Sequence, residues 1–323
     1  MAKKIAVVIL TWNGVSWLQK FLPTVVKHSQ EADIFVIDNA STDGTLAFLT
    51  QHFPEVKIIS NTKNIGFAAG YNEGLKSVPN EFYCLLNSDV EVTENWLQSP
   101  LEIFEKNKEI AAIQPKIRSY SQPEFFEFAG AAGGFIDNLG YPYCRGRIFE
   151  NLEKDGGQYD DEIEIFWASG CAFFIRREDF WSQKGFDARF FAHQEEIDLC
   201  WRLINAGRKI FYSGQSVVFH VGGGTLNKTN PRKTFLNFRN NLTMMLKNLP
   251  FPQLIWIIFL RLILDGAAAI YLTKKEGFSH LLAVLRAHFG FYSQAPKTWK
   301  MRQKRQIKHY YQQKWLVFKS FFY

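Results

Sequence analysis

The sequence predicts an α/β protein in which a doubly wound sheet is covered by helices. Three observations support this class. Short apolar runs rich in β-branched residues alternate with helical patterns over residues 5–113. Polar residues follow each apolar run at once, as they do at strand ends that bind ligands. The chain has 323 residues, 47% of them hydrophobic and 21% charged, enough for one domain of roughly 220–250 residues and a smaller appendage.

The first strand is expected at residues 5–10, where IAVVIL is a continuous apolar run typical of a strand buried on both faces. The same alternation predicts strands at 34–37, 56–59, 82–86 and 111–113, and helices at 15–27, 45–52, 68–77 and 94–106. Glycines and aromatic residues between 117 and 161 indicate loops and a hairpin. Regular structure is expected again at 163–176, in a helix at about 195–206, and in strands at 209–212 and 216–220.

The net charge of +7 is unevenly distributed. Residues 274–323 contain eleven Lys and Arg and one acid, so this tail carries +10 and the rest of the chain −3. A mildly acidic domain with a basic, aromatic tail favours attachment to an anionic membrane surface over nucleic-acid binding, and no nucleic-acid motif is present in the sequence.

Several function classes are excluded by missing patterns. The four cysteines stand far apart without a CxxC pair, so neither a zinc knuckle nor a disulfide framework is indicated, and a reducing cytoplasm is expected. The opening apolar run is too short for the core of a signal peptide. No GxGxxG follows the first strand, and no GxxxxGK with Ser or Thr occurs, which argues against a dinucleotide fold and a P-loop.

Polar residues at four expected strand ends are the candidate ligand-binding groups. Turns alone favour Asn, Asp and Gly, which explains any single strand end, but four in series indicate a nucleotide-binding edge. The groups are Thr11, Trp12 and Asn13, then Asp38 with residues 39–41, then residues 61–66, and then Asn87, Ser88 and Asp89.

Asp89 and His220 are the candidate metal ligands. Magnesium and manganese prefer oxygen ligands and share them with phosphates, and an imidazole close to Asp89 would complete such a site. A lone Asp at a turn or a lone His at a strand end is more often structural. The glycines at 222–224, directly after this histidine, would let the backbone approach a phosphate.

Glu195 and Glu196 open the expected helix at 195–206 and are the candidate general base. Acids are common in a first helical turn because they complement the helix dipole, so a structural role is the simpler interpretation. Two adjacent carboxyls after the aromatic pair at 190–191 could instead share a partly desolvated site, where one pKa rises toward neutrality.

Six motifs in order resemble a family-two glycosyltransferase over about residues 4–240, nearest to the bacterial rhamnosyltransferase-like branch that builds cell-surface polysaccharides. They are VVILTWNG (7–14), VIDNASTDGT (36–45), NTKNIGFAAGYNEGL (61–75), LLNSDVEVT (85–93), WASGCAFFIRR (167–177) and FFAHQEEIDLCWRLINAGRKI (190–210). The resemblance implies a GT-A fold, a Rossmann-like mixed sheet flanked by helices, at residues 1–230. Its donor-binding half would be 1–115 and its acceptor and catalytic half 116–230.

The resemblance also implies a nucleotide-sugar donor, a divalent cation (Mg²⁺ or Mn²⁺), inversion at the anomeric carbon, and a role for each matched residue. Glu196 would be the base, with Glu195 orienting it or the acceptor. Asp89 and His220 would hold the metal. Donor contacts would come from Thr11, Trp12, Asn13, Asp38, Asn64, Gly66, Asn72, Asn87, Ser88 and Asp89, and acceptor contacts from Trp167, Ser169 and Gly170.

Two positions depart from the family pattern. Asn87 replaces the first Asp of the usual DxD motif, which removes one negative metal ligand. Glu196 replaces the commoner Asp, and its longer side chain leaves the choice of base between Glu195 and Glu196 open.

Residues 231–323 are expected to form a helical, membrane-associating extension. Residues 234–249 look helical and contain an Arg239-Asn240 pair, for which a structural role is favoured over a donor contact. Residues 254–272 are largely apolar but include Arg261 and Asp265, which are four apart and able to pair. A helix in the membrane interface or packed on the domain is therefore preferred to a spanning one.

The sequence thus predicts a hexosyltransferase-type enzyme at the inner face of the cell membrane, transferring rhamnose from dTDP-rhamnose to a lipid-linked or growing glycan. A UDP-hexose or UDP-N-acetylhexosamine donor is an alternative, as is a catalytically weak scaffolding subunit of a polysaccharide assembly complex. A homodimer is left open.

Overall fold

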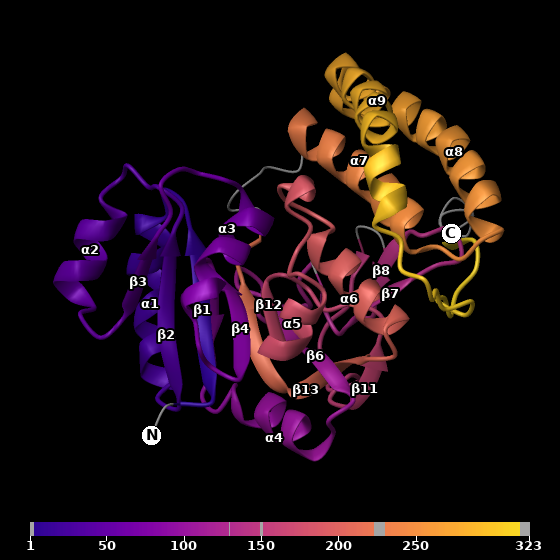
Figure 1. Ribbon diagram of the computed structural model, residues 1–323. Coiled ribbons are helices and arrows are strands. Elements are labelled where there is room, and N and C mark those ends of the chain that lie inside the picture. Colours follow the sequence, from indigo (N-terminus) through magenta and orange to yellow (C-terminus); the bar gives the residue numbers. More distant parts are fainter. Residues whose placement is uncertain (1–2, 129, 149–150, 223–229, 317–323) are drawn as a thin grey trace.

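The computed structural model describes residues 3–128, 130–148, 151–222 and 230–316. Within these residues a nine-stranded mixed sheet has the order β11-β13-β6-β12-β4-β1-β2-β3, with β5 pairing the end of β13 (Figure 1). Its strands are β1 (Ile5–Thr11), β2 (Ala32–Asp38), β3 (Lys57–Ser60), β4 (Phe82–Asn87), β5 (Val90–Val92), β6 (Ile110–Ser119), β11 (Glu162–Ile165), β12 (Ala172–Arg176) and β13 (Lys209–His220).

The four strands β1 to β4 are parallel, which places their carboxyl ends at one edge. β12 runs antiparallel between β4 and β6, and β13 runs parallel to β6. The expected α/β class is therefore confirmed, with a mixed sheet.

Helices cover both faces of this sheet. The odd positions of β1 (Ile5, Val7 and Ile9) pack in one core with α1 (Val15–His28), α2 (Thr45–His52) and α4 (Gln98–Lys106). The even positions (Ala6 and Val8) pack in a second core with α3 (Phe67–Gly74), α5 (Arg177–Ser182) and α6 (Glu195–Asn205). Burial of both sets explains why the strand reads as a continuous apolar run. Two short 3₁₀ turns lie at Leu75–Ser77 and Ala188–Phe190.

The region expected to hold a hairpin instead contains a second, four-stranded antiparallel sheet. Its strands are β7 (Gly134–Ile136), β8 (Pro142–Cys144), β9 (Arg147–Ile148) and β10 (Asn151–Leu152). The two strands expected at 209–212 and 216–220 form the single strand β13, whose register against β6 shifts between Ser213 and Val217. β6 is correspondingly longer than the expected 111–113.

Three helices form the carboxyl-terminal region: α7 (Pro231–Asn248), α8 (Gln253–Glu276) and α9 (Phe278–Lys300). They stand together beyond β7 and β8, far from β1 to β3 (Figure 1). Arg261 and Asp265 are buried and lie 3.6 Å apart, as expected for their spacing. The segment after α9 is not a free tail, because Tyr310 is buried against Trp201 at a ring distance of 5.3 Å. Residues 317–323 lie outside the described residues.

Candidate functional site

The carboxyl ends of β1, β2 and β4 bring the predicted donor residues to one edge. Backbone hydrogen bonds join the ends of β1, β2 and β3: the Asn39 amide donates to the Thr11 carbonyl and the Asn61 amide to the Asp38 carbonyl, both at 2.8 Å. Asp38 itself is buried. Parallel strands already place their carboxyl ends at one edge of the sheet. The two hydrogen bonds also fix the loops that follow the strands relative to one another.

The turn after β1 is tied to the turn after β2. The Asn13 amide donates to Ser41 Oγ at 2.8 Å, while Asn13 Oδ1 accepts from the Thr42 amide at 2.7 Å. Between these turns Trp12 is 52% exposed. An exposed indole on a rigid turn offers a flat surface for stacking on a nucleobase.

A second group at this edge surrounds the Thr11 hydroxyl. That hydroxyl is buried and has no hydrogen-bond partner among the described residues. A Cβ on Gly14 would collide with it and would lie 3.8 Å from Ser88 Oγ. Thr11, Gly14 and Ser88 therefore converge, and glycine is needed for the close approach.

The two predicted donor-pocket asparagines take structural hydrogen bonds. Asn64 Oδ1 accepts from Asn39 Nδ2 and from the Gly66 amide, both at 3.0 Å, which shapes the loop before α3. Asn72 pairs with the Phe186 backbone through both of its side-chain groups, at 2.7 and 2.9 Å. Both side chains position loops here, and their donor contacts stay predictions.

Asp89 and His220 come together, although 131 positions separate them in the sequence. Strand pairing sets this contact, because Val90 of β5 is opposite His220 at the end of β13. His220 Nε2 lies 3.2 Å from Asp89 Oδ1 and 3.5 Å from Asn87 Nδ2. On the other side of the ring, Nδ1 lies 3.5 Å from Glu127 Oε2. Burial would lower the pKa of His220, but its contacts with Cys171, Asp89 and Glu127 raise that pKa well above the ordinary value.

This pair can contribute two ligands to a divalent cation. No cluster of three or more His, Cys, Asp or Glu side chains among the described residues is arranged to hold a metal. Asp89 and His220 nevertheless offer a carboxylate oxygen and a ring nitrogen 3.2 Å apart. Magnesium commonly takes one or two protein ligands and completes its shell with substrate phosphates and water, so the two residues fit that use. Residues 223–224 of the glycine run lie outside the described residues.

Glu195 and Glu196 lie at the first turn of α6. One oxygen of each carboxyl, Oε2, has no hydrogen-bond partner among the described residues. Burial raises the pKa of Glu196 to about 7, partly opposed by backbone amides including that of Gly170. Burial and the neighbouring Glu196 raise the pKa of Glu195 well above its ordinary value. Glu195 is the more buried of the two, and Glu196 is partly exposed.

The loop at 190–194 connects this pair to the donor side. Its Phe191 carbonyl accepts from the Phe67 and Ala68 amides at 2.8 and 3.3 Å, at the start of α3. Gly66, with φ +84°, has no room for a Cβ, which would lie 2.6 Å from the Phe191 ring. The loop therefore packs on the donor-side residues and leads within five residues to Glu196.

The predicted acceptor residues have different surroundings. A Cβ on Gly170 would lie 3.8 Å from Glu196 Cδ, so this backbone borders the candidate base. Ser169 is buried, and its amide donates to Gln114 Oε1 at 2.9 Å. Trp167 is also buried and donates from its indole to the Phe135 carbonyl at 2.7 Å. The structure gives the indole a packing role on β7, and its contact with an acceptor stays a prediction.

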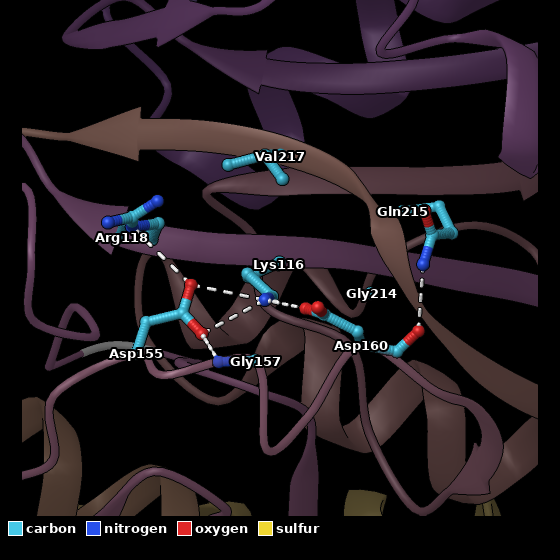
Figure 2. A pocket seen from close by; sticks show the side chains of 8 residues that line it. All are labelled: Lys116, Arg118, Asp155, Gly157, Asp160, Gly214, Gln215 and Val217. Carbon is cyan, nitrogen blue, oxygen red and sulfur yellow. Dashed lines mark hydrogen bonds and ion pairs between the residues drawn. The ribbon is translucent and has the colours of Figure 1, made fainter.

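A cavity of about 370 Å³ lies away from these residues, against β6 and β13. Figure 2 shows Lys116 at its centre, in ion pairs with Asp155 and Asp160, while Arg118 also lies close to Asp155. These charges compensate one another within the wall. The cavity thus contains none of the predicted site residues.

Two side chains that contact His220 were not singled out from the sequence. Glu127 and Cys171 flank His220 from loops remote in the chain. Asn240 donates to carbonyls of the 190–194 loop from α7. Asn39 was among the predicted strand-end residues, and the pair of Arg239 and Asn240 was expected to have a structural role.

Comparison with known proteins agrees with this architecture. Residues 6–183 match the family described as Glycosyl transferase family 2. The chain is 24% identical over 239 residues to the N-acetylglucosaminyl-diphospho-decaprenol L-rhamnosyltransferase of Mycobacterium tuberculosis, covering 68% of this chain and 76% of that protein. It is 21% identical over 212 residues to rhamnosyltransferase WbbL of Escherichia coli K12, covering 64% and 79%.

Among solved structures, GalNAc-T7 with UDP, GalNAc and Mn²⁺ superposes with a TM-score of 0.61 at 19% identity. The match covers 76% of this chain and 48% of that one, so the protein spans about half the length of GalNAc-T7. This likeness confirms the GT-A fold.

The family match extends over more than half of the chain. The protein therefore belongs to glycosyl transferase family 2, within its rhamnosyltransferase-like branch.

Proposed function

We propose that the protein is an inverting, metal-assisted glycosyltransferase that moves rhamnose from dTDP-rhamnose to a hydroxyl of a lipid-linked or growing cell-surface glycan. The observation that carries the proposal is the carboxyl of Glu196, whose pKa burial raises to about 7 and whose buried Oε2 has no hydrogen-bond partner among the described residues. Such a carboxyl is suited to accept a proton near neutral pH.

Two relatives whose names specify rhamnosyl transfer support the choice of sugar. The alternative donor is a UDP-hexose or UDP-N-acetylhexosamine, in line with the UDP and GalNAc bound in GalNAc-T7. The acceptor class follows from the decaprenol-linked substrate in the name of the mycobacterial relative.

In the proposed mechanism the donor's base stacks on Trp12, and Thr11, Asn13 and Asp38 hold the base and ribose. Asp89 and His220 would hold a divalent cation, whose charge would stabilise the leaving diphosphate. Glu196 takes the proton of the acceptor hydroxyl while the oxygen of that hydroxyl forms a bond to the anomeric carbon. The bond between the anomeric carbon and the nucleoside diphosphate breaks on the opposite face of the sugar. One displacement of this kind inverts the configuration and needs one base.

Thermal stability against a panel of nucleotide sugars tests this proposal. A ligand at 100 times its dissociation constant stabilises the folded state by about 2.7 kcal/mol, which raises the melting temperature by several degrees. We expect dTDP-rhamnose to give the largest rise, and a larger one with Mn²⁺. A larger rise in melting temperature with a UDP-sugar would identify that sugar, and not dTDP-rhamnose, as the donor. Folded protein that responds to no donor would contradict the proposal and favour a scaffolding role.

We further propose that α8 and α9 attach the enzyme peripherally to the inner face of the cell membrane. α8 is long and apolar enough to cross a membrane, but its Arg261 and Asp265 face the protein: Arg261 stacks on Tyr141 and donates to the Leu139 carbonyl at 2.9 Å. Its outward face is therefore free of these charges.

The outward faces of the two helices are apolar. In α9 the exposed apolar residues from 278 to 292 are spaced alternately by four and three positions, and the last follows after seven, so they form one stripe along the helix. The membrane face comprises Ile255, Trp256, Phe259, Ile263, Ile270 and Tyr271 of α8, and Phe278, Leu282, Leu285, Phe289, Tyr292 and Trp299 of α9. Exposed basic residues at 274, 275, 286, 297 and 300 accompany it. Aromatic and basic side chains on one surface suit an anionic lipid interface.

A further inference from the structure

The loop at 190–194 has an unusual backbone for the segment that leads into a catalytic helix. Phe191, His193 and Gln194 have φ of +65°, +69° and +73°, in the left-handed region that residues other than glycine rarely adopt. Such conformations persist only where surrounding contacts impose them. Contacts that hold this loop therefore also determine the position of Glu195 and Glu196 at the start of α6.

Those contacts come mainly from one side chain of α7. Asn240 is buried, and its Nδ2 donates toward the carbonyls of Phe190, Ala192 and His193 at 3.0, 2.9 and 2.8 Å. An amide nitrogen has two hydrogens, so three carbonyls around it share them. One side chain thus gathers three of the loop's carbonyl oxygens.

Arg239 fixes which way that amide points. Its guanidinium donates to Asn240 Oδ1 through Nε at 2.9 Å and through Nη2 at 2.7 Å, which leaves Nδ2 directed at the loop. Nη2 also donates to the carbonyls of Arg189 and Phe190 at 2.9 and 3.1 Å. The pair acts as a unit, because reversal of the amide would oppose acceptor to acceptor and donor to donor.

Arg239 also packs against α9, the helix proposed to lie at the membrane. A Cβ on Gly290 of α9 would lie 3.2 Å from Arg239 Cδ. Arg189, at the start of the loop, donates to Thr298 Oγ1 of α9 at 3.0 Å. The hydrogen bonds around the loop therefore continue into α9.

We propose that Asn240, oriented by Arg239, is a positioning residue for the general base: it holds the 190–194 loop so that Glu196 faces the acceptor site beside Gly170. This rests on the proposed function for the role of Glu196. Within the described part of the chain, the side chain of Asn240 bonds to backbone carbonyls and to Arg239, so it acts through the loop and touches no reacting atom.

The test compares Asn240→Asp with Thr243→Val. The first substitution keeps the shape of the side chain but places oxygen where the amide donated, while Thr243 is equally buried in α7 and bonds to the Arg239 carbonyl of its own helix. Carbodiimide labelling, which requires a protonated carboxyl, is followed by mass spectrometry across a pH series on the peptide containing Glu195 and Glu196. Hydrogen–deuterium exchange of residues 190–198 is measured on the same proteins.

In the wild type we expect half-maximal labelling of Glu196 near pH 7. In Asn240→Asp the loop loosens, water reaches the carboxyl, and the midpoint moves about one pH unit lower while exchange at 190–198 accelerates. Thr243→Val should match the wild type in both. Unchanged labelling and exchange in folded Asn240→Asp would overturn the proposal. If that variant does not fold, Arg239→Met decides in the same way.

Turnover with dTDP-rhamnose adds a second readout. Misplacement of a catalytic group by about 1 Å costs about a hundredfold in rate, so kcat should fall by that order in Asn240→Asp while the donor's dissociation constant stays unchanged. An equal loss in donor binding would overturn a positioning role. The labelling and exchange measurements need no substrate. They therefore test the positioning role of Asn240 even if dTDP-rhamnose is not the donor.

Discussion

His220 lies between two carboxylates, with Nε2 3.2 Å from Asp89 and Nδ1 3.5 Å from Glu127. The strand pairing of β5 with β13 brings the first pair together, and a loop remote in the sequence supplies the second. Metal-binding histidines commonly contact a carboxylate through the nitrogen that faces away from the metal. In the proposed metal site, Nε2 and Asp89 would therefore be the metal-binding side and Glu127 the carboxylate behind the ring.

The metal role of Asp89 predicts a specific loss. Asp89→Asn removes a charged oxygen ligand, so Mn²⁺ should no longer add to the thermal shift produced by the donor, and the Mn²⁺ affinity measured by electron paramagnetic resonance should fall at least about tenfold. Glu91→Gln, on neighbouring β5, is the matched control and should retain both. An Asp89→Asn variant with wild-type Mn²⁺ affinity would remove this residue from the site.

Glu196→Gln should abolish transfer while leaving donor binding intact. The amide keeps the size of the side chain but cannot accept the acceptor's proton, and loss of a general base typically costs about 10²–10⁴ in kcat. Glu195→Gln is the comparison, because Glu195 is the more buried residue of the two and should contribute less to kcat. Rate measurements together with donor titration of both variants separate the roles. Near-normal transfer by Glu196→Gln would move the base to Glu195.

The raised pKa of Glu196 predicts a pH-dependent effect on stability. The folded state binds this proton more tightly than the unfolded chain. Protonation of Glu196 therefore adds to the stability of the folded state below pH 4.5, and this added stability is lost as the pH rises to about 7. Glu196→Gln removes the titration. Relative to the wild type, its melting temperature should therefore increase between pH 4.5 and pH 7.5. A constant difference across that range would show that the carboxyl has an ordinary pKa when the protein is folded.

The local pattern of the sequence was sufficient for most of the parallel half of the sheet. Helix α2 has the expected bounds of 45–52, and β1 differs from its prediction by one residue. These elements alternate strictly, and each packs on neighbours close in sequence. β13 was divided because Ser213, Gly214 and Gln215 read as a turn, whereas the strand continues through a register shift.

The candidate donor residues were predictable where they follow a strand end, and Glu195 and Glu196 because they open a helix after an aromatic pair. Thr11, Asp38 and Asn87 were found because the carboxyl ends of parallel strands meet. Glu127 and Asn240 were not assigned to the site, because each reaches its partner through a fold contact about 50 or more positions away in the sequence. Composition also could not separate inward from outward aromatics in the tail: Tyr310 is buried, whereas Trp299 is exposed.

Substitution of Lys247 of α7 is expected to lower the free energy of unfolding strongly. Its ammonium is buried and donates to Asp187 at 3.1 Å and to Asp198 of α6 at 2.8 Å. Lys247→Met would leave two carboxylates with fewer partners, which costs about 3–5 kcal/mol for a buried pair broken on one side. Urea unfolding measures this change. Lys106→Met in the exposed pair with Glu102 is the control and should cost less than about 1 kcal/mol.

The membrane face of α8 and α9 predicts binding to anionic vesicles. Trp256 and Phe289 are 74% and 73% exposed, so the double substitution of both by Ser should leave the fold intact and reduce partitioning into phosphatidylglycerol vesicles severalfold in co-sedimentation. Leu46→Ser, an exposed residue on α2, should have no effect. High salt should also weaken vesicle binding by the wild type, because the basic residues near the lipid contribute about 1 kcal/mol each and salt screens them.

A second copy of the chain is the alternative occupant of this membrane face, since two apolar stripes could equally cover each other. Light scattering tests it: a wild-type dimer that Trp256→Ser with Phe289→Ser converts to a monomer, without vesicle binding by either, would assign the face to a homodimer.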